Sequence, residues 1–194
     1  YMLGKVFDGI IGFFPSTLGK EITYPSGFRI SADRAPNKRG MHDVCPNIVK
    51  NLASEIEKEE IAVAFILDNG MDFELDDVWK AILKKMELII VQTYAMTPLA
   101  KAADIILPGL APFEREGTVT NDQGHVQWLR PSIPAKGEAR SDWQILCLLY
   151  SNGGKYNDIS NILKDMGNDF PSYSDISLFK LGDHGLRLNG SSKT

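Results

Sequence analysis

The stretch ELIIVQTYAMTPLAKAADIILPG (87–109) decides the fold, because two apolar runs in it flank a short helical segment. ELIIVQT (87–93) and DIILPG (104–109) are continuous apolar runs, as expected of strands that are buried on both faces of a sheet. Between them, TPLAKAA (97–103) offers Thr97 as a helix N-cap, and the proline that follows suits the first helical position. Two strands joined by a short helix predict a parallel pair with a right-handed crossover.

The same pattern extends toward the amino terminus. IAVAFILD (61–68) is a third continuous apolar run, and ELDDVWKAILKKM (74–86) is a predicted helix with acids at its start and lysines at its end, which matches the helix dipole. PNIVKNLASEIEKEE (46–60) carries apolar residues at helical spacing. We therefore predict an α/β fold with a three-layer open parallel sheet, Rossmann-like, in a domain over residues 46–152.

Two shorter elements follow the third strand. FEREGTVTNDQGHVQ (113–127) contains two alternating segments around a polar turn, which predict small strands at 117–120 and 125–130. We treat residues 113–130 as a small strand extension of the parallel domain. SDWQILCLLYSN (141–152) predicts a helix that begins with a Ser/Asp cap.

The two ends of the chain are predicted to be arms. Residues 1–45 are rich in loop signals and are expected to be irregular, apart from a short strand at GFRIS (27–31). Residues 153–194 form the C-terminal arm, which we expect to be partly disordered, with one weak helix at 157–166 and a disordered end at RLNGSSKT (187–194).

The composition excludes several classes of protein. The 194 residues are 43% hydrophobic, which is enough for a sizeable core. The apolar runs are far shorter than the ~20 residues that a membrane-spanning helix needs. A net charge of −4 gives no reason to expect nucleic acid as a partner.

The cysteines and histidines suggest no metal or catalytic centre. Cys45 and Cys147 are far apart, and the chain has no CxxC motif or Cys/His cluster that would hold zinc or an iron–sulfur cluster. We expect two reduced thiols in a cytosolic protein, with a single disulfide as the alternative. The three histidines, His42, His125 and His184, have no evident acid and nucleophile partners, and no GxSxG, GxGxxG or Walker motif occurs. We therefore assign no catalytic and no metal-binding residue.

Polar side chains gather where the three predicted strands end. In open parallel sheets, ligands bind beyond the carboxyl ends of the strands. The carboxylate, amide and hydroxyl groups at these ends would suit a ribose, a purine edge or a phosphate. The alternative is that they cap helices and form turns, which every α/β protein needs. The residues concerned are Asp68, Asn69, Gln92, Thr93 and Thr97.

The segment from 91 to 146 resembles the molybdopterin oxidoreductase family in three ordered blocks. LDNG (67–70) and NKRGMHDV (37–44) resemble two further segments of that family upstream. The first block matches at Gln92, Thr97, Ala100, Ala103, Asp104, Leu107 and Pro108, the second at Glu114, Gly117, Thr118, Asn121, Gly124 and Gln127, and the third at Gly137, Glu138, Ala139, Arg140, Asp142 and Trp143.

The resemblance implies a parallel α/β domain that, in complete enzymes, helps to hold a molybdopterin guanine dinucleotide. The strand-end residues of the family face the guanine nucleotide part, which agrees with the polar edge described above. The resemblance also adds Pro108 and Asn121 to the candidate cofactor-binding residues.

This sequence departs from the family pattern at several of those positions. Thr93 replaces an Asp, Leu99 replaces a Thr, and Leu67 replaces a Gly. Gly70 and His125 replace a Pro and an Arg. These changes favour a degenerate nucleotide site in a structural domain. They point to the large iron–sulfur subunit of bacterial NADH:quinone oxidoreductase (complex I), a branch of the family that generally keeps the domain without the pterin.

Two alternatives remain open. The first is the domain that holds the dinucleotide in a formate dehydrogenase-like molybdenum or tungsten enzyme, and the second is a freestanding nucleotide-binding module. Because the chain begins with Tyr1, we expect a fragment or a processed product that is not catalytic alone. Its iron–sulfur clusters would lie in the amino-terminal part of the parent. Its partners would be the remaining domains and other subunits of a respiratory complex. The complex would be cytoplasmic and peripheral to the inner membrane, so that the chain contacts the membrane only indirectly.

Overall fold

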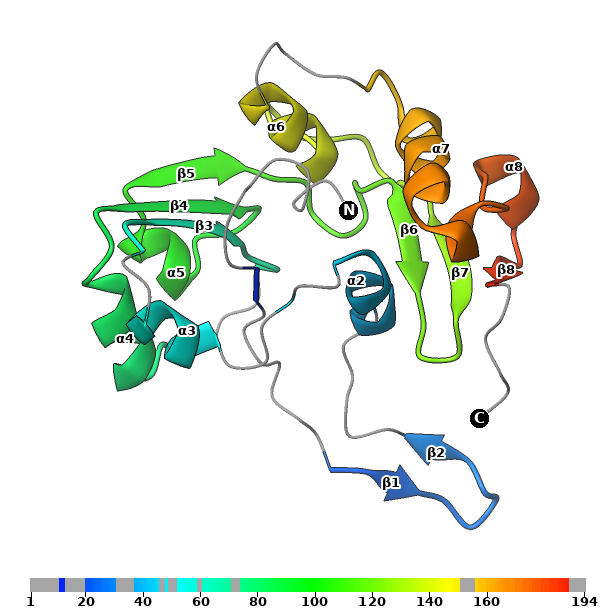
Figure 1. The fold of residues 1–194 in the computed structure, drawn as a ribbon, viewed down its shortest axis with the longest axis horizontal. Coiled ribbons are helices and arrows are strands. Elements are labelled where there is room, and N and C mark those ends of the chain that lie inside the picture. Colours follow the sequence, from blue (N-terminus) through cyan, green and yellow to red (C-terminus); the bar gives the residue numbers. More distant parts are fainter. Residues whose placement is uncertain are drawn as a thin grey trace.

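The described residues form two three-stranded sheets and a small hairpin (Figure 1). The computed structural model describes residues 11–12, 20–30, 37–45, 48, 52–58, 61–70, 74–150 and 156–188. The first sheet contains the strands β3 (Val63–Leu67), β4 (Leu88–Thr93) and β5 (Ile105–Pro108), in that order.

The first sheet is parallel, as the apolar runs and short crossovers predict. Leu67 lies opposite Gln92, and Gln92 lies opposite Leu107, so the three strands end at the same level. Two main-chain bonds continue the ladder beyond the strands: Asp68 N to Gln92 O at 2.9 Å, and Gly109 N to Thr93 O at 2.9 Å. The carboxyl ends of the strands therefore form one continuous rim.

Helices cover both faces of this sheet, which gives the predicted three layers (Figure 1). Successive residues of β3 face opposite sides, because side chains alternate along a strand. Ile66 packs toward α4 (Asp77–Leu83) and α5 (Pro98–Ala102), in a core with Ile89, Val91, Leu83, Leu99 and Ala100. Phe65 packs toward Leu146 and Cys147 of α6 (Asp142–Leu149) on the other face.

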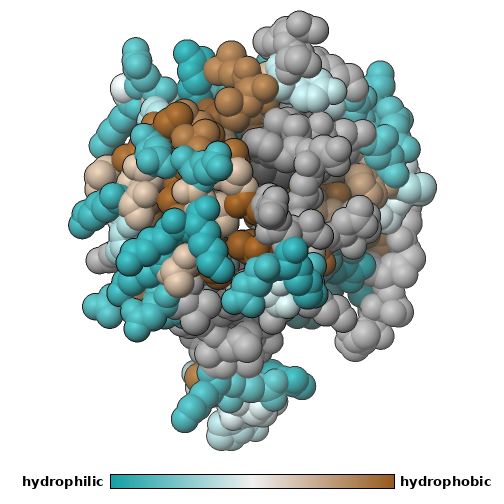
Figure 2. Space-filling model, turned by 60° about the vertical axis from the view of Figure 1, so that its left-hand side comes forward, coloured by the Kyte–Doolittle hydropathy of each residue, from teal (hydrophilic) through white to brown (hydrophobic). Residues whose placement is uncertain are grey.

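The strand β5 is the last strand of its sheet in the described part of the chain. Ile105 and Ile106 of this strand are 44% and 41% exposed. Beyond them, Arg140 N donates to Pro108 O at 3.1 Å, so the chain near Arg140 covers only the carboxyl end of the strand. Figure 2 brings the side with the parallel sheet forward and shows hydrophobic side chains gathered on that face.

The second sheet is antiparallel and contains β6 (Gly117–Thr120), β7 (His125–Leu129) and β8 (Leu186–Arg187). Its first two strands are the predicted extension. Against it pack α7 (Ile159–Asp169), the 3₁₀ helix η1 (Pro171–Tyr173) and α8 (Leu178–Leu181). The core of this part contains Val126, Ile159, Leu163, Met166, Tyr173, Ile176, Leu181 and Leu188.

The C-terminal arm contains more regular structure than its sequence suggests. The weak helix expected at 157–166 corresponds to α7, whose buried residues recur on one face. The elements η1, α8 and β8 were not predicted, because each is at most four residues long and too short for a periodic pattern. The expected disordered end at 187–194 falls mostly outside the described residues.

The N-terminal arm also contains unpredicted structure. The short strand expected at 27–31 is β2 (Arg29–Ile30), which pairs with β1 (Ile22–Thr23) in a hairpin that projects from the body (Figure 1). The helix α2 (Lys38–Val44) lies in a segment that we expected to be irregular. Its sequence has no apolar stripe.

Two polar contacts help to hold α2 in place. Arg39 Nε donates to both carboxylate oxygens of Asp43, one turn later, at 2.8 and 2.9 Å. At the start of the helix, Asn37 Oδ1 accepts from Thr120 N of β6 at 2.8 Å. This helix depends on contacts with the second sheet, which its local sequence does not reveal.

Two further helices of the predicted domain lie next to each other. The helix predicted over 46–60 is described as α3 (Leu52–Lys58), and it lies beside α4. At the start of α4, the Asp76 side chain accepts from Trp79 N at 2.9 Å, which is an N-cap contact. The acids at the start of this predicted helix therefore include its cap.

Candidate functional site

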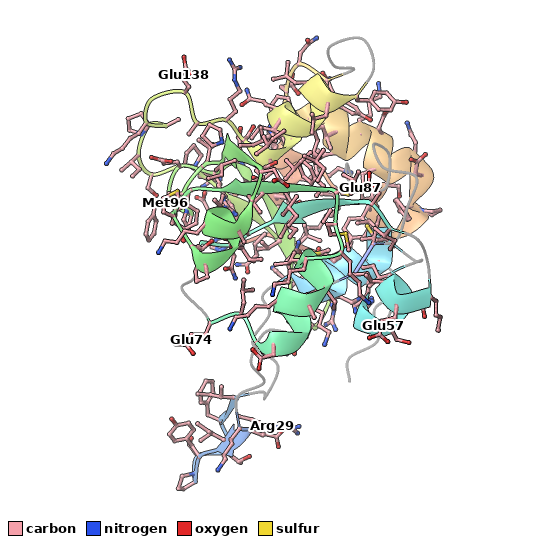
Figure 3. All side chains as sticks on the ribbon, turned by 90° about the vertical axis from the view of Figure 1, so that its left-hand side faces the viewer. Arg29, Glu57, Glu74, Glu87, Met96 and Glu138 are labelled. Atoms are coloured by element: carbon pink, nitrogen blue, oxygen red, sulfur yellow. The ribbon has the colours of Figure 1, made fainter. Side chains whose placement is uncertain are left out.

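The carboxyl rim of the parallel sheet brings together most of the predicted site residues. Asp68 and Asn69 follow β3, Gln92 and Thr93 end β4, and Pro108 ends β5. Thr97 begins α5 at the same level of the sheet. Figure 3 shows Met96, directly before this helix, at the opposite end of the sheet from Glu87, which precedes β4.

Asp68 and Thr97 form a buried pair on this rim. Asp68 is 6% exposed and Thr97 is 3% exposed. The Thr97 hydroxyl donates to Oδ2 of Asp68, and Gly70 N donates to Oδ1 at 3.1 Å. Thr97 Oγ1 also accepts from Ala100 N at 3.1 Å, so it is the N-cap of α5, as predicted. The Asp68 carboxylate therefore joins the end of β3 to the start of α5.

Thr93 uses its hydroxyl within the protein. Its Oγ1 donates to Ala95 O and accepts from Ala95 N, both at 3.3 Å, and the residue is 4% exposed. It shapes the turn after β4. Asn69 and Pro108 are exposed on the rim.

Gln92 contacts a residue that the sequence did not suggest as part of the site. Its Nε2 donates to Oδ1 of Asp142, the first residue of α6, at 2.6 Å. Gln92 is 2% exposed, and no described residue forms a hydrogen bond with its buried Oε1. Leaving such an acceptor without a partner costs about 1–3 kcal/mol, so a buried group of this kind requires an explanation.

Arg115 completes this network from the loop between the two sheets. Its guanidinium lies 3.9 Å from Asp142 Oδ2, and its Nε donates to Leu110 O at 2.7 Å. The same guanidinium lies 5.8 Å from the centre of the Tyr94 ring, which follows β4. Arg115 therefore contacts both the Asp142 carboxylate and the aromatic side chain at the rim.

The turn after β3 needs a glycine where Tyr94 approaches it. Gly70 has a φ of +72°, which a residue with a side chain rarely adopts. A Cβ at this position would lie 2.3 Å from Cζ of Tyr94. The family pattern has a proline here, so the Gly70 departure from that pattern accompanies a ring packed directly on the turn.

The structure does not place Asn121 on the rim. Asn121 lies in the turn between β6 and β7, at the end of the second sheet that points away from the parallel sheet (Figure 1). Its Oδ1 accepts from Gln123 N at 3.0 Å and from His125 N at 2.9 Å. It was grouped with the rim through the family resemblance. In this geometry its side chain stabilises its own turn.

The described residues offer no further chemical centre of the usual kinds. No group of three or more His, Cys, Asp or Glu side chains that could hold a metal ion occurs among them. Cys45 and Cys147 are both buried and free. Within the same residues, no helix has the length and apolar character needed to cross a membrane.

A comparison with known protein families shows to which family the chain belongs. The sequence profile described as molybdopterin oxidoreductase matches residues 18–152. The chain belongs to the molybdopterin oxidoreductase family. The match includes the whole parallel sheet and its rim, together with β6, β7 and α6.

Several relatives of known activity match this chain. The alpha subunit of F420-dependent formate dehydrogenase 2 from Methanococcus maripaludis is 34% identical over 121 residues, which cover 60% of this chain and 18% of the relative. Formate dehydrogenase H from Escherichia coli is 31% identical, and the match covers 66% of this chain and 18% of the relative. The assimilatory nitrate reductase catalytic subunit from Bacillus subtilis is 36% identical, with 55% and 16% covered. The chain therefore spans less than a fifth of the length of these relatives.

A solved structure supports the fold. Acetylene hydratase from Pelobacter acetylenicus superposes with a TM-score of 0.52 and 16% sequence identity, over 72% of this chain and 21% of that chain. At this identity, the similarity shows the α/β fold with its parallel sheet and carries no statement about activity.

Proposed function

We propose that this chain is part of the cofactor-holding domain of a formate dehydrogenase-like molybdenum or tungsten oxidoreductase. The observation that carries the proposal is the carboxyl rim, where polar residues from β3 and β4 and the start of α5 meet in a chain of this family. The relatives described above include formate dehydrogenase subunits, so they favour this hypothesis over a domain of NADH:quinone oxidoreductase.

The residues on the rim fit the nucleotide end of a molybdopterin guanine dinucleotide. The buried Gln92 Oε1 is an acceptor without a partner in the part of the chain that the structure describes, and a purine edge carries N–H donors. Asn69 is exposed on the same rim and supplies both donors and an acceptor. When bound, the cofactor would supply the metal and its redox chemistry. The residues of this chain would bind and orient the nucleotide end.

The structure weakens one argument for a degenerate site. Leu99, which replaces a Thr of the family pattern, is 2% exposed and packs in the core under the sheet with Val91. Its substitution therefore removes no polar group from the rim surface. The replacement of the family's Asp by Thr93 does remove a carboxylate from the rim. The Thr93 hydroxyl forms its hydrogen bonds within the turn.

The first test is chemical analysis of the complete parent protein, purified without oxygen. We expect stoichiometric molybdenum or tungsten by elemental analysis, and a fluorescent pterin derivative after oxidation. Formate should reduce an artificial electron acceptor in its presence. A correctly folded parent with neither metal nor pterin would contradict the proposal and would return the NADH:quinone oxidoreductase reading to first place.

A pair of variants tests the contribution of the rim. Asn69→Ala should lower the amount of pterin retained through purification, because it removes an exposed polar side chain from the rim. Asn168→Ala is the matched control, since Asn168 is also exposed but lies on α7 beside the second sheet. Equal pterin content in the two variants would argue against a role for Asn69.

The partners of the chain are also proposals. Because the relatives are more than five times longer than the part that this chain matches, we propose that the remaining domains of the parent pack around it. Any iron–sulfur clusters would be carried by those domains or by other subunits, since the described residues contain no cluster of suitable ligands.

A further inference from the structure

We infer that Asp142 is a positioning residue of the rim: it orients the Gln92 amide so that the carbonyl oxygen is left to accept an N–H donor of the bound nucleotide. The inference rests on the proposed function and deepens it, because it concerns how the same site selects its ligand. It starts from the 2.6 Å contact between Gln92 Nε2 and Asp142 Oδ1.

The direction of the Gln92 amide follows from the chemistry of this contact. A carboxylate oxygen accepts hydrogen bonds, so the group that faces Asp142 is the NH₂ group of Gln92. The amide is planar, and its oxygen must therefore point elsewhere. That oxygen is buried, in a residue that is 2% exposed, and it has no hydrogen-bond partner among the described residues. A buried acceptor in this state can receive a hydrogen bond from an N–H donor of a bound ligand.

Arg115 keeps the orienting carboxylate in place. Its guanidinium lies 3.9 Å from Oδ2 of Asp142, the oxygen that Gln92 does not use. Its Nε bond to Leu110 O fixes the base of the same side chain at 2.7 Å. Asp142 is thus held between a cation and an amide donor, which favours one arrangement of all three groups.

The network also reaches the surface of the rim. The Arg115 guanidinium lies over the face of Tyr94, whose ring packs on the turn at Gly70. Tyr94 is 38% exposed, so the outer end of this network is open to solvent. A nucleotide that contacts the rim beside Tyr94 would therefore lie next to the side chains that set the orientation of Gln92.

The test measures nucleotide binding by the protein purified without bound cofactor, with GMP as the probe. Asp142→Asn keeps the size of the side chain, but its amide can donate to Gln92 Oε1 and so turn the Gln92 NH₂ group toward the ligand. We expect the dissociation constant for GMP to rise about tenfold or more, which corresponds to about 1.4 kcal/mol. Asp183→Asn is the matched control, because Asp183 also pairs with an arginine, Arg130, but beside the second sheet, after α8 and β7 respectively.

A double-mutant cycle separates positioning from a general structural effect. If Asp142 acts through Gln92, then Gln92→Leu should weaken GMP binding, and adding Asp142→Asn to it should cause little further loss. The side-chain NH₂ signals of Gln92 in an ¹⁵N spectrum, assigned by their loss in Gln92→Leu, should shift on addition of GMP in the unmodified protein. They should not shift in Asp142→Asn.

The outcomes are distinguishable. Unchanged GMP affinity in Asp142→Asn, or fully additive losses in the cycle, would overturn the positioning role while leaving the proposed function intact. If the unmodified protein binds no GMP and its parent contains no pterin, both the function and the inference fail. A fall in thermal stability of Asp142→Asn without any change in GMP binding would show a purely structural contact and would also overturn the inference.

Discussion

The hydroxyl of Tyr173 donates a hydrogen bond to Oδ2 of Asp43 over 3.1 Å, although the two residues lie 130 positions apart in the chain. Since the phenol has one hydrogen, the contact between Tyr173 and Thr120 at 3.1 Å must have the threonine hydroxyl as its donor. Asp43 is in turn bound by Arg39. One buried phenol thus joins the N-terminal helix α2, the strand β6 and the C-terminal segment.

Removal of this hydroxyl should destabilise the protein. Tyr173→Phe leaves the Thr120 hydroxyl and one Asp43 oxygen without that partner, in a site where the tyrosine is 2% exposed. We expect the free energy of unfolding to fall by about 1–3 kcal/mol, measured by urea denaturation. Tyr24→Phe in the exposed hairpin is the control and should have almost no effect. Equal stability of the two variants would show that this network contributes nothing.

The raised pKa of Tyr173 predicts that the protein loses stability at high pH. Burial, with a contribution from the Asp43 charge, raises the pKa of Tyr173 from 10.0 to about 12. Because the folded pKa lies above the unfolded one, the stabilising contribution is complete below about pH 10 and is lost as the pH rises through 12. Between these pH values, the free energy of unfolding from urea denaturation should decrease more steeply with pH for the unmodified protein than for Tyr173→Phe. An equal dependence of the unfolding free energy on pH in the two proteins would contradict the prediction.

Gly70→Ala should be more damaging than an ordinary glycine substitution. The added Cβ would lie 2.3 Å from the Tyr94 ring, and the φ of +72° is already unfavourable for alanine. Gly137→Ala is the matched control, because Gly137 also has a positive φ, +59°, but nothing lies within 4 Å of its Cβ position.

We expect Gly137→Ala to cost about 1 kcal/mol, the ordinary size of a backbone penalty of this kind, and Gly70→Ala to cost more. Combining Gly70→Ala with Tyr94→Ala should restore the part of the loss that comes from the ring. If the two single alanine variants are equally stable in chemical denaturation, the packing of Tyr94 on this turn does not constrain the site.

Thr97 should contribute to stability through two contacts at once. Thr97→Ala removes the N-cap of α5 and the donor to the buried Asp68 carboxylate, which should cost about 2 kcal/mol or more. Ser177→Ala removes only the N-cap of α8, which is exposed, and should cost about 1 kcal/mol. Thr97→Ser keeps the hydroxyl and should recover most of the loss. A Thr97→Ser variant as unstable as Thr97→Ala would show that the methyl group, not the hydroxyl, matters.

The parallel sheet could be read from the sequence, because each strand is a continuous apolar run with short connections on either side. The ends of β3 and β4 follow from the same pattern, so Asp68, Gln92 and Thr97 were correctly expected to meet. The hydroxyl of Thr97 was also correctly expected to cap a helix. These features depend on local sequence and on the geometry of parallel sheets alone.

The contacts that connect distant segments could not be read in this way. Asp142 lies 50 positions after Gln92, and nothing in its neighbourhood points to the rim. Its place in the third block of the family resemblance was the one available signal. The helix α2 was missed for a related reason, since its contacts with Thr120 and Tyr173 come from segments far along the chain. Asn121 was grouped with the rim from a shared motif, and a motif does not state which sheet a residue lies beside.

The exposed strand β5 has a consequence for experiments on this chain by itself. A strand at the end of a sheet presents main-chain groups that are ready to pair with another strand, and here Ile105 and Ile106 add apolar contact area. Copies of this chain would pair with one another along this strand. Self-association that increases with concentration should therefore accompany the isolated chain, and lysines substituted at these two isoleucines would suppress it.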